Sequence, residues 1–219
     1  MTSAVRVLKL AANVAGRDFV IGDIHGAYDL VVAAMKAVGF RQDVDRLFCV
    51  GDLVDRGKDS ARVEKFLAQP YVFAVRGNHD DLLADTDPEA IAALAIVNFN
   101  GMHWLRDLPL GQVARIQRQL GALPYAIEIA SIDGGEPTGI IHAQAPQNWD
   151  WPTLVEALQE WPTDDGLFED VMTSRYKFEC ADATPVVGAR RVFAGHTISW
   201  SGPKVLGNTV FVDTGAFAT

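Results

Sequence analysis

Three short apolar runs in the first third of the chain each end in a glycine and a group of polar side chains. The runs are DFVIGD (18–23), RLFCVGD (46–52) and YVFAV (71–75), and the motifs at their ends are GDIHG (22–26), GDLVDRG (51–57) and RGNHD (76–80). Segments 27–39 and 60–69 separate the runs and have the period of amphipathic helices. A strand–helix–strand–helix–strand order predicts parallel strands joined by right-handed crossovers. Because the carboxyl ends of parallel strands lie at one edge of a sheet, we expect these polar motifs to meet there.

The remainder of the chain predicts further helices and a return to β-structure. Helices are expected at 88–97, 110–121, 152–160 and 165–172, and the first residues, 1–16, are interpreted as a strand. YAIEIA and TGIIHA flank the turn-rich SIDGGEP and predict a hairpin. RVFAG and KVLGNTVFVDTG predict the last strands, with a tight turn at Gly207-Asn208. Since no repeat or linker divides the sequence, we expect a single α/β domain over residues 1–219 with a mixed sheet system.

Charge and composition exclude several classes of partner. The 219 residues carry 19 Lys and Arg against 28 Asp and Glu, a formal net charge of −9. Such a chain repels nucleic acid and anionic membranes unless a local patch or a bound metal reverses the field. Lys9 interrupts the N-terminal apolar stretch, and no run approaches the roughly 18 apolar residues of a membrane span. Cys49 and Cys180 lack metal-ligand or redox spacing and are expected as free thiols, so we expect a cytoplasmic protein.

Four of the five histidines lie at predicted strand ends. His25 and His79 belong to the motifs above, His142 ends the run TGII, and His196 follows RVFAG. A single histidine at a strand end is more often a hydrogen-bonded structural residue than a ligand, but four such placements are hard to explain independently. The residues expected to share one site are Asp23, His25, Asp52, Asp55, Asn78, His79, His142 and His196.

This set of side chains indicates a site for divalent metal ions. Carboxylate oxygens, an amide oxygen and imidazoles suit Mn, Fe or Zn better than they suit an all-oxygen Ca or Mg cage. The set contains more ligands than one ion binds from protein when it must also keep coordination positions open for substrate. Two ions about 3.5–4 Å apart that share one carboxylate fit better, and such pairs catalyse displacement at phosphorus.

The ordered motifs resemble those of the metal-dependent phosphoprotein phosphatase family, and most closely its small bacterial and phage-type Ser/Thr phosphatases. The resemblance rests on GDIHG, GDLVDRG, RGNHD, His142 and GHT, and it extends to TSR (173–175) and DTGA (213–216). Asp23 and Asp52 are 29 residues apart, and Asp52 and Asn78 are 26 apart. The resemblance implies two mixed β-sheets packed as a sandwich and flanked by helices. A dinuclear centre, of manganese with iron or zinc as alternatives, would lie between the loops.

The resemblance also implies a role for each site residue. Asp23 and His25 would bind the first metal, Asp52 would bridge, and Asn78, His142 and His196 would hold the second. His79 would be the general acid, oriented by Asp55. Arg56 and Arg175, with Asn78 beside them, would bind the phosphate oxygens of a phosphoprotein or another phosphate ester.

The reaction implied is direct attack by a hydroxide that bridges two metal ions, without a phosphoenzyme. Cys49 lies in an apolar strand without the Arg-rich loop of a catalytic thiol, which agrees with this mechanism. A Ser/Thr protein phosphatase is the first interpretation, because few residues lie between the motifs to build a nucleotide clamp.

Three other functions remain open. A symmetrical diadenosine tetraphosphate hydrolase would use the same centre. A related nuclease usually has GHxH, whereas Ile198 occupies the second of those positions here. A non-catalytic module would be expected to lack some of the metal ligands of the motifs, and none of them is missing here.

The sequence departs from the family pattern at three places within the motifs. Asp80 stands where the family usually has Glu, and Thr173 stands where a Trp commonly precedes the phosphate-binding Arg175. The segment HAQAP after His142 also differs from the usual forms.

Overall fold

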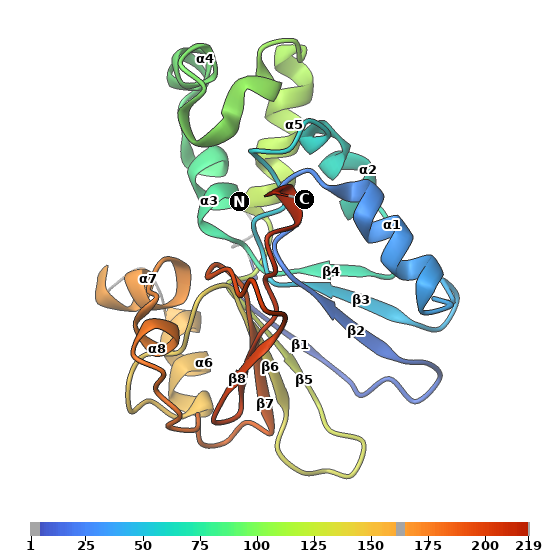
Figure 1. Ribbon diagram of the computed structural model, residues 1–219, viewed down its shortest axis with the longest axis vertical. Coiled ribbons are helices and arrows are strands. Elements are labelled where there is room, and N and C mark those ends of the chain that lie inside the picture. Colours follow the sequence, from blue (N-terminus) through green and yellow to red (C-terminus); the bar gives the residue numbers. More distant parts are fainter. Residues whose placement is uncertain (1–4, 161–164, 219) are drawn as a thin grey trace.

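Two β-sheets lie against each other with helices on both outer sides (Figure 1). The computed structural model describes residues 5–160 and 165–218. The smaller sheet has the strand order β2-β3-β4, and the larger has the order β1-β5-β6-β7-β9-β8. This arrangement confirms the predicted two-sheet α/β fold.

The smaller sheet is formed by the three apolar runs that precede the polar motifs. Its strands are β2 (Asp18–Ile21), β3 (Arg46–Cys49) and β4 (Val72–Ala74), and every pairing among them is parallel. Helix α1 (Tyr28–Ala37) connects the first two, and η1 (Ser60–Arg62) with α2 (Val63–Leu67) connects the next two. The expected strand–helix alternation is confirmed. The expectation that both sheets are mixed is corrected here, because helical crossovers leave this sheet parallel throughout.

The larger sheet is mixed. Its strands are β1 (Val7–Leu10), β5 (Ala126–Ile129), β6 (Thr138–Ile141), β7 (Arg191–Ala194), β8 (Lys204–Leu206) and β9 (Thr209–Phe211). The pairs β5–β6 and β8–β9 are antiparallel, and the other three pairs are parallel. Both antiparallel pairs are predicted hairpins, and Gly207 adopts a left-handed φ of 61° at the second turn.

Alternating side chains of the strands supply two different cores. In β3, Phe48 faces the other sheet, whereas Leu47 and Cys49 face the helices. The Phe48 and Phe73 rings stack at 5.2 Å within the layer between the sheets. That layer also contains Val50, Val75, Ile127, Ile129 and Ile140. Because each of these side chains is buried, each contributes roughly 1.5–3 kcal/mol to holding the sheets together.

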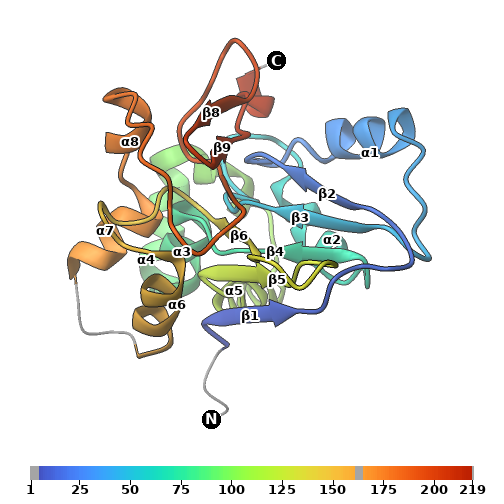
Figure 2. The same cartoon turned by 90° about the horizontal axis from the view of Figure 1, so that it is seen from below.

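Helices cover the outer face of each sheet (Figure 2). Beside the smaller sheet, in addition to α1 and α2, lie α3 (Asn78–Asp85), α4 (Pro88–Ile96), η2 (Phe99–Leu105) and α5 (Leu110–Gly121). Beside the larger sheet lie α6 (Trp151–Glu160), α7 (Asp165–Met172) and α8 (Tyr176–Glu179). In the described ranges, no helix combines the length and apolarity needed to cross a bilayer.

All four helices expected after the third motif are present at 88–96, 110–121, 151–160 and 165–172. Among the described residues, four helical segments were not predicted, and the last of them is η3 (Ala216–Ala218). Helix α3 begins within the third polar motif, at Asn78. Segment η2 contains two left-handed residues, Asn100 and Gly101, which break its helical period. Helix α8 has only four residues.

Trp151 anchors α6 on the larger sheet. Its side chain is fully buried, and its indole N–H donates to Glu128 Oε2 at 2.8 Å. The ring lies against Gly139 in β6, where an added Cβ would come within 2.7 Å of three ring carbons. The close approach of strand and ring therefore requires glycine at this position.

We predict that Gly139→Ala lowers the free energy of unfolding by about 1–3 kcal/mol, because the Trp151 ring must move or the strand must shift. Gly111→Ala is the control, since Gly111 is exposed in α5 and a Cβ there meets nothing closer than 4.0 Å. That change is expected to be neutral or stabilising by up to about 1 kcal/mol. Urea unfolding of both variants tests the contact, and equal stabilities would contradict it.

Candidate metal centre

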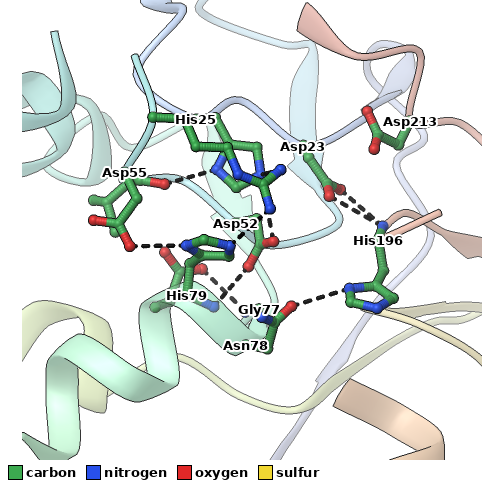
Figure 3. A network of polar contacts seen from close by, with 12 residues as sticks. Asp23, His25, Asp52, Asp55, Gly77, Asn78, His79, His196 and Asp213 are labelled. Atoms are coloured by element: carbon green, nitrogen blue, oxygen red, sulfur yellow. Dashed lines mark hydrogen bonds and ion pairs between the residues drawn. The ribbon is translucent and has the colours of Figure 1, made fainter. Parts of the chain in front are cut away.

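The polar residues at the strand ends converge from both sheets (Figure 3). The loop after β2 supplies Asp23 and His25, and the loop after β3 supplies Asp52, Asp55 and Arg56. Helix α3, which follows β4, supplies Asn78 and His79. His142 follows β6, and His196 follows β7. The eight residues expected to share a site therefore do so, although their strands belong to two sheets and not to one.

Close backbone contact between two loops places Asp52 at the middle of this site. A Cβ added to Gly51, which has a φ of 103°, would lie 2.7 Å from both the Gly77 nitrogen and His142 Nδ1. A Cβ added to Gly77 would overlap the backbone and carboxylate of Asp52. The backbone N–H of His79 donates to Asp52 Oδ1 at 2.9 Å. Both glycines are therefore required for the loops to meet.

Two clusters of potential ligands share Asp52. His25, Asp52 and His79 form the first, and Asp52, His142 and His196 form the second, with the ligand atoms of each within 4.8 Å of one another. The distances from Asp52 are 3.5 Å to His25 Nε2 and 3.6 Å to His142 Nε2. One carboxylate thus stands between two groups of nitrogen donors.

Asn78 joins the second cluster. Its Oδ1 lies 3.0 Å from His142 Nε2 and 3.0 Å from His196 Nδ1. Neighbouring ligands of one ion bound at about 2.1 Å are separated by about 3.0–3.4 Å, so these spacings suit a single divalent cation.

Backbone carbonyls fix the orientation of two histidines. His25 Nδ1 donates to the Val54 carbonyl at 2.8 Å, and His142 Nδ1 donates to the Val50 carbonyl at 2.8 Å. In the tautomer that makes these bonds, each ring has its Nε2 directed toward Asp52. A lone pair that faces a carboxylate is unfavourable unless a cation lies between them, so the donors present fit a metal ion.

His79 belongs to a separate hydrogen-bonded chain. Its Nδ1 lies 2.8 Å from Asp55 Oδ2, and the indole N–H of Trp104 donates to Asp55 Oδ1 at 2.9 Å. Asp55 and His79 are both buried. This chain fixes the His79 ring so that Nε2 points into the site.

Two arginines lie at opposite sides of the clusters. Arg56 donates to the Nε2 atoms of His25 and His79 at 2.9 and 3.0 Å. Arg175 is exposed and donates to the His196 carbonyl at 3.1 Å. The presence of Thr173 in place of the usual Trp therefore does not keep Arg175 away from the site.

Asp23 lies beside the clusters and next to a second buried carboxyl group, that of Asp213. Both Asp23 oxygens accept the His196 backbone N–H at 3.1 Å. Burial, followed by the Asp213 and Asp52 carboxylates, raises the pKa of Asp23 well above its usual value. Burial likewise raises the pKa of Asp213. These buried carboxyl groups create a local excess of negative charge, offset in part by Arg56, that favours a bound cation.

Burial and neighbouring charge also shift the remaining groups. Burial opposes ionisation of Asp52, but the surrounding His142, His79 and His25 lower its pKa below the usual value. Burial lowers the pKa of His25 to about 4 and that of His196 to about 3, so both rings are neutral and able to bind a metal. Burial opposes protonation of His79 too, yet Asp55 and Asp52 together raise its pKa.

Comparisons with known proteins agree with this geometry. Residues 19–200 match the family model described as calcineurin-like phosphoesterase. The chain belongs to this family.

Curated relatives in the family carry names of two kinds, protein phosphatase and dinucleoside tetraphosphatase. The chain is 26% identical over 225 residues to "Serine/threonine-protein phosphatase 2" of Escherichia coli, covering 97% of this chain and 94% of that protein. It is 44% identical over 64 residues to a symmetrical bis(5'-nucleosyl)-tetraphosphatase of an Enterobacter species, which covers 28% of this chain and 23% of the other. A solved structure described provisionally as a diadenosine tetraphosphatase superposes with a TM-score of 0.64 at 24% identity, covering 98% of this chain and 90% of that one, and it shows the shared fold.

Membership of the calcineurin-like family confirms the resemblance deduced from the motifs. Members of the family use a dinuclear divalent metal site, and this chain has the imidazole, carboxylate and amide groups suited to binding metal. The chain is thus a metallophosphoesterase.

Sequence analysis missed three residues of this site. Trp104 belongs to no motif, and its role arises only from the fold. Asp213 lies in DTGA, which was recognised without a role for the carboxylate. Asp80 was noted only as a replacement for Glu. Its carboxylate accepts the Leu53 and Gly77 N–H groups at 3.0 Å each, and so joins the loops after β3 and β4.

We predict that Asp80→Ala lowers the free energy of unfolding by about 2–5 kcal/mol, because it leaves two buried N–H groups without acceptors. Asp85→Ala is the control, since that side chain lies at the end of the same helix and is 71% exposed. Chemical denaturation of the metal-free variants measures the difference. A loss in Asp80→Ala no larger than that of the control would contradict the role of Asp80.

Proposed function

We propose that this phosphoesterase removes phosphate from phosphoserine and phosphothreonine in proteins, with two divalent metal ions as cofactors. The observation that carries the proposal is the buried pair of His79 and Asp55 at the edge of the Asp52-centred clusters. Serine and threonine alkoxides are poor leaving groups, and a positioned acid contributes most to their departure.

The ligand assignment follows the resemblance of the motifs, and the two Asp52-centred clusters support its use of His25, His142 and His196. Asp52 would bridge the ions, with Asp23 and His25 on one side. Asn78, His142 and His196 would hold the second ion. When bound, two such ions supply Lewis-acid charge for phosphoryl oxygens and make a coordinated water more acidic. Nitrogen and oxygen donors of this kind suit manganese, and also accept iron or zinc.

His79 would donate the proton to the leaving oxygen from Nε2. Asp55 accepts the Nδ1–H bond and stabilises the protonated ring, which agrees with the raised pKa of His79. Nε2 can carry that proton only when it is not accepting a hydrogen bond from Arg56. A phosphate that draws the Arg56 guanidinium to itself therefore also frees Nε2 for the proton.

Arg56 and Arg175 would bind the phosphate oxygens from two sides, with the Asn78 side chain between them. A planar guanidinium forms two parallel hydrogen bonds with phosphate, which fixes the orientation of the ester. The Arg56 guanidinium contacts two imidazoles of the site, whereas Arg175 contacts only the His196 carbonyl, so Arg56 is proposed as the principal contact.

A dinucleoside polyphosphate is the second candidate substrate, because a symmetrical bis(5'-nucleosyl)-tetraphosphatase is among the relatives. That similarity covers 28% of the chain, whereas the similarity to the named protein phosphatase covers 97%. The extent of the similarity supports the phosphoprotein substrate.

The substrate assignment is tested with protein stripped by chelator and reloaded with Mn. Phosphate release from a phosphoserine peptide and cleavage of diadenosine tetraphosphate are measured side by side. We expect kcat/KM to be higher for the peptide. Preference for the dinucleotide would replace the proposed substrate, and turnover of neither would contradict both candidates.

We predict that His79→Asn reduces turnover of the phosphoserine peptide by about two to four orders of magnitude, because the general acid is lost. The loss should be much smaller with a nitrophenyl ester, whose leaving group departs without a proton. Mn content, measured by elemental analysis, should not change. Equal losses with the two substrates would exclude the acid role.

We predict that titration of the stripped protein with Mn gives two bound ions per chain by calorimetry. Asp52→Asn should weaken both sites, because the shared carboxylate loses its charge. His142→Ala should weaken only the second. His103→Ala is the control, since His103 is exposed and bonded to Asn98 outside both clusters. Loss of both sites in His142→Ala as well would argue against two separable ions.

A further inference from the structure

Phe217 covers one face of the Arg56 guanidinium. The Arg56 Cζ lies 4.6 Å from the centre of the ring. The ring also meets the His25 imidazole edge-on, with centroids 5.1 Å apart and planes at 85°. Phe217 belongs to η3 (Ala216–Ala218), in the C-terminal segment that ends among the loops after β2 and β3 (Figure 1). None of the roles assigned above includes this half-buried side chain.

A turn built on buried groups directs Phe217 to this place. Asp213 is buried, and its Oδ1 accepts the Gly215 N–H at 2.9 Å. Gly215 has a left-handed φ of 76°, and its carbonyl accepts the Ala218 N–H at 2.9 Å. The chain therefore reverses immediately before the aromatic ring, which is held by the fold and does not hang freely.

The backbone of Arg56 is equally constrained. Arg56 has a φ of 63°, unusual for a residue with a side chain, and its N–H donates to the Gly101 carbonyl at 3.2 Å. The long side chain beyond it has many rotamers, and ordering them reduces the affinity for any ligand that it binds.

The two kinds of contact on the guanidinium are independent. Hydrogen bonds use its edge, and the contact with Phe217 uses its face. A histidine that gives its Nε2 lone pair to a cation cannot also accept a hydrogen bond from Arg56. The aromatic contact needs no lone pair, so it can persist while the N–H groups turn from the imidazoles to the oxygens of a phosphate.

We propose that Phe217 is a positioning residue for phosphate binding: its ring holds the plane of the Arg56 guanidinium so that the N–H edge meets the substrate phosphate. The inference rests on the proposed function only in placing a phosphate group at Arg56. Phe217 contributes no proton and no metal ligand.

The test measures KM and kcat for the phosphoserine peptide and the affinity of the Mn-loaded protein for inorganic phosphate. We expect Phe217→Ala to raise KM and the phosphate Kd by about two- to fivefold, the usual worth of a cation–π contact at an exposed arginine. We expect kcat to stay within about threefold and Mn affinity to stay unchanged.

Two substitutions at the same position separate the aromatic contact from simple packing. Phe217→Trp keeps a ring that attracts a cation and should restore phosphate affinity, whereas Phe217→Leu keeps apolar bulk and should not. If Phe217→Leu binds phosphate as the wild type does, the positioning role is excluded. A loss of Mn affinity in Phe217→Ala would also overturn it, because the ring would then act through His25.

A double-mutant cycle with Arg56→Ala tests whether Phe217 acts through Arg56. In that background, Phe217→Ala should change phosphate affinity no further, and an additive loss would contradict the proposal. Phosphate binding does not depend on which ester is hydrolysed. The affinity measurement therefore still tests Phe217 if the protein fails to hydrolyse the peptide. Absence of phosphate binding by the Mn-loaded wild type would overturn both the inference and the proposed function.

Discussion

Direct backbone contact between the loops after β3 and β4 is the constraint on which the rest of the site depends. Gly51 and Gly77 have no room for a Cβ, and Asp52 lies at their meeting point. The contact brings the first residues of α3 beside the Asp52 carboxylate, so Asn78 and His79 face the centre from the start of a helix. Any side chain at either glycine would separate the loops and, with them, the ligands.

The centre contains several buried acidic side chains. Asp23, Asp52 and Asp213 are all at most 3% exposed. Burial of carboxylates without a compensating positive charge is costly, and proteins normally avoid it by pairing, protonation or metal binding. Arg56 compensates part of this charge, yet burial still raises the pKa values of Asp23 and Asp213. The arrangement is therefore organised for cations and only secondarily for stability.

Much of this site was predictable because its residues follow strands that the sequence marks clearly. Apolar runs ending in glycine located the strand ends, and the ordered motifs identified the donors. Trp104 and Phe217 were not predictable, since they reach Asp55 and Arg56 through the packing of η2 and η3 and lie in no motif of their own. The division of the strands into two sheets was implied only by the resemblance to the phosphatase family. Periodicity shows that a run such as DFVIGD is a strand, but not which strand it will pair with.

The site also lies across the seam between the two sheets. Asp52 follows a strand of the smaller sheet, while His142 and His196 follow strands of the larger one. Between the strands of the two sheets lies a layer of apolar side chains, whose hydrophobic contacts have no preferred direction. An ion that binds Asp52 together with His142 and His196 would link the two sheets at one end of that layer through bonds of fixed direction. It would fix the position of one sheet relative to the other. Binding of the ion would then produce both the catalytic centre and the alignment of the two sheets.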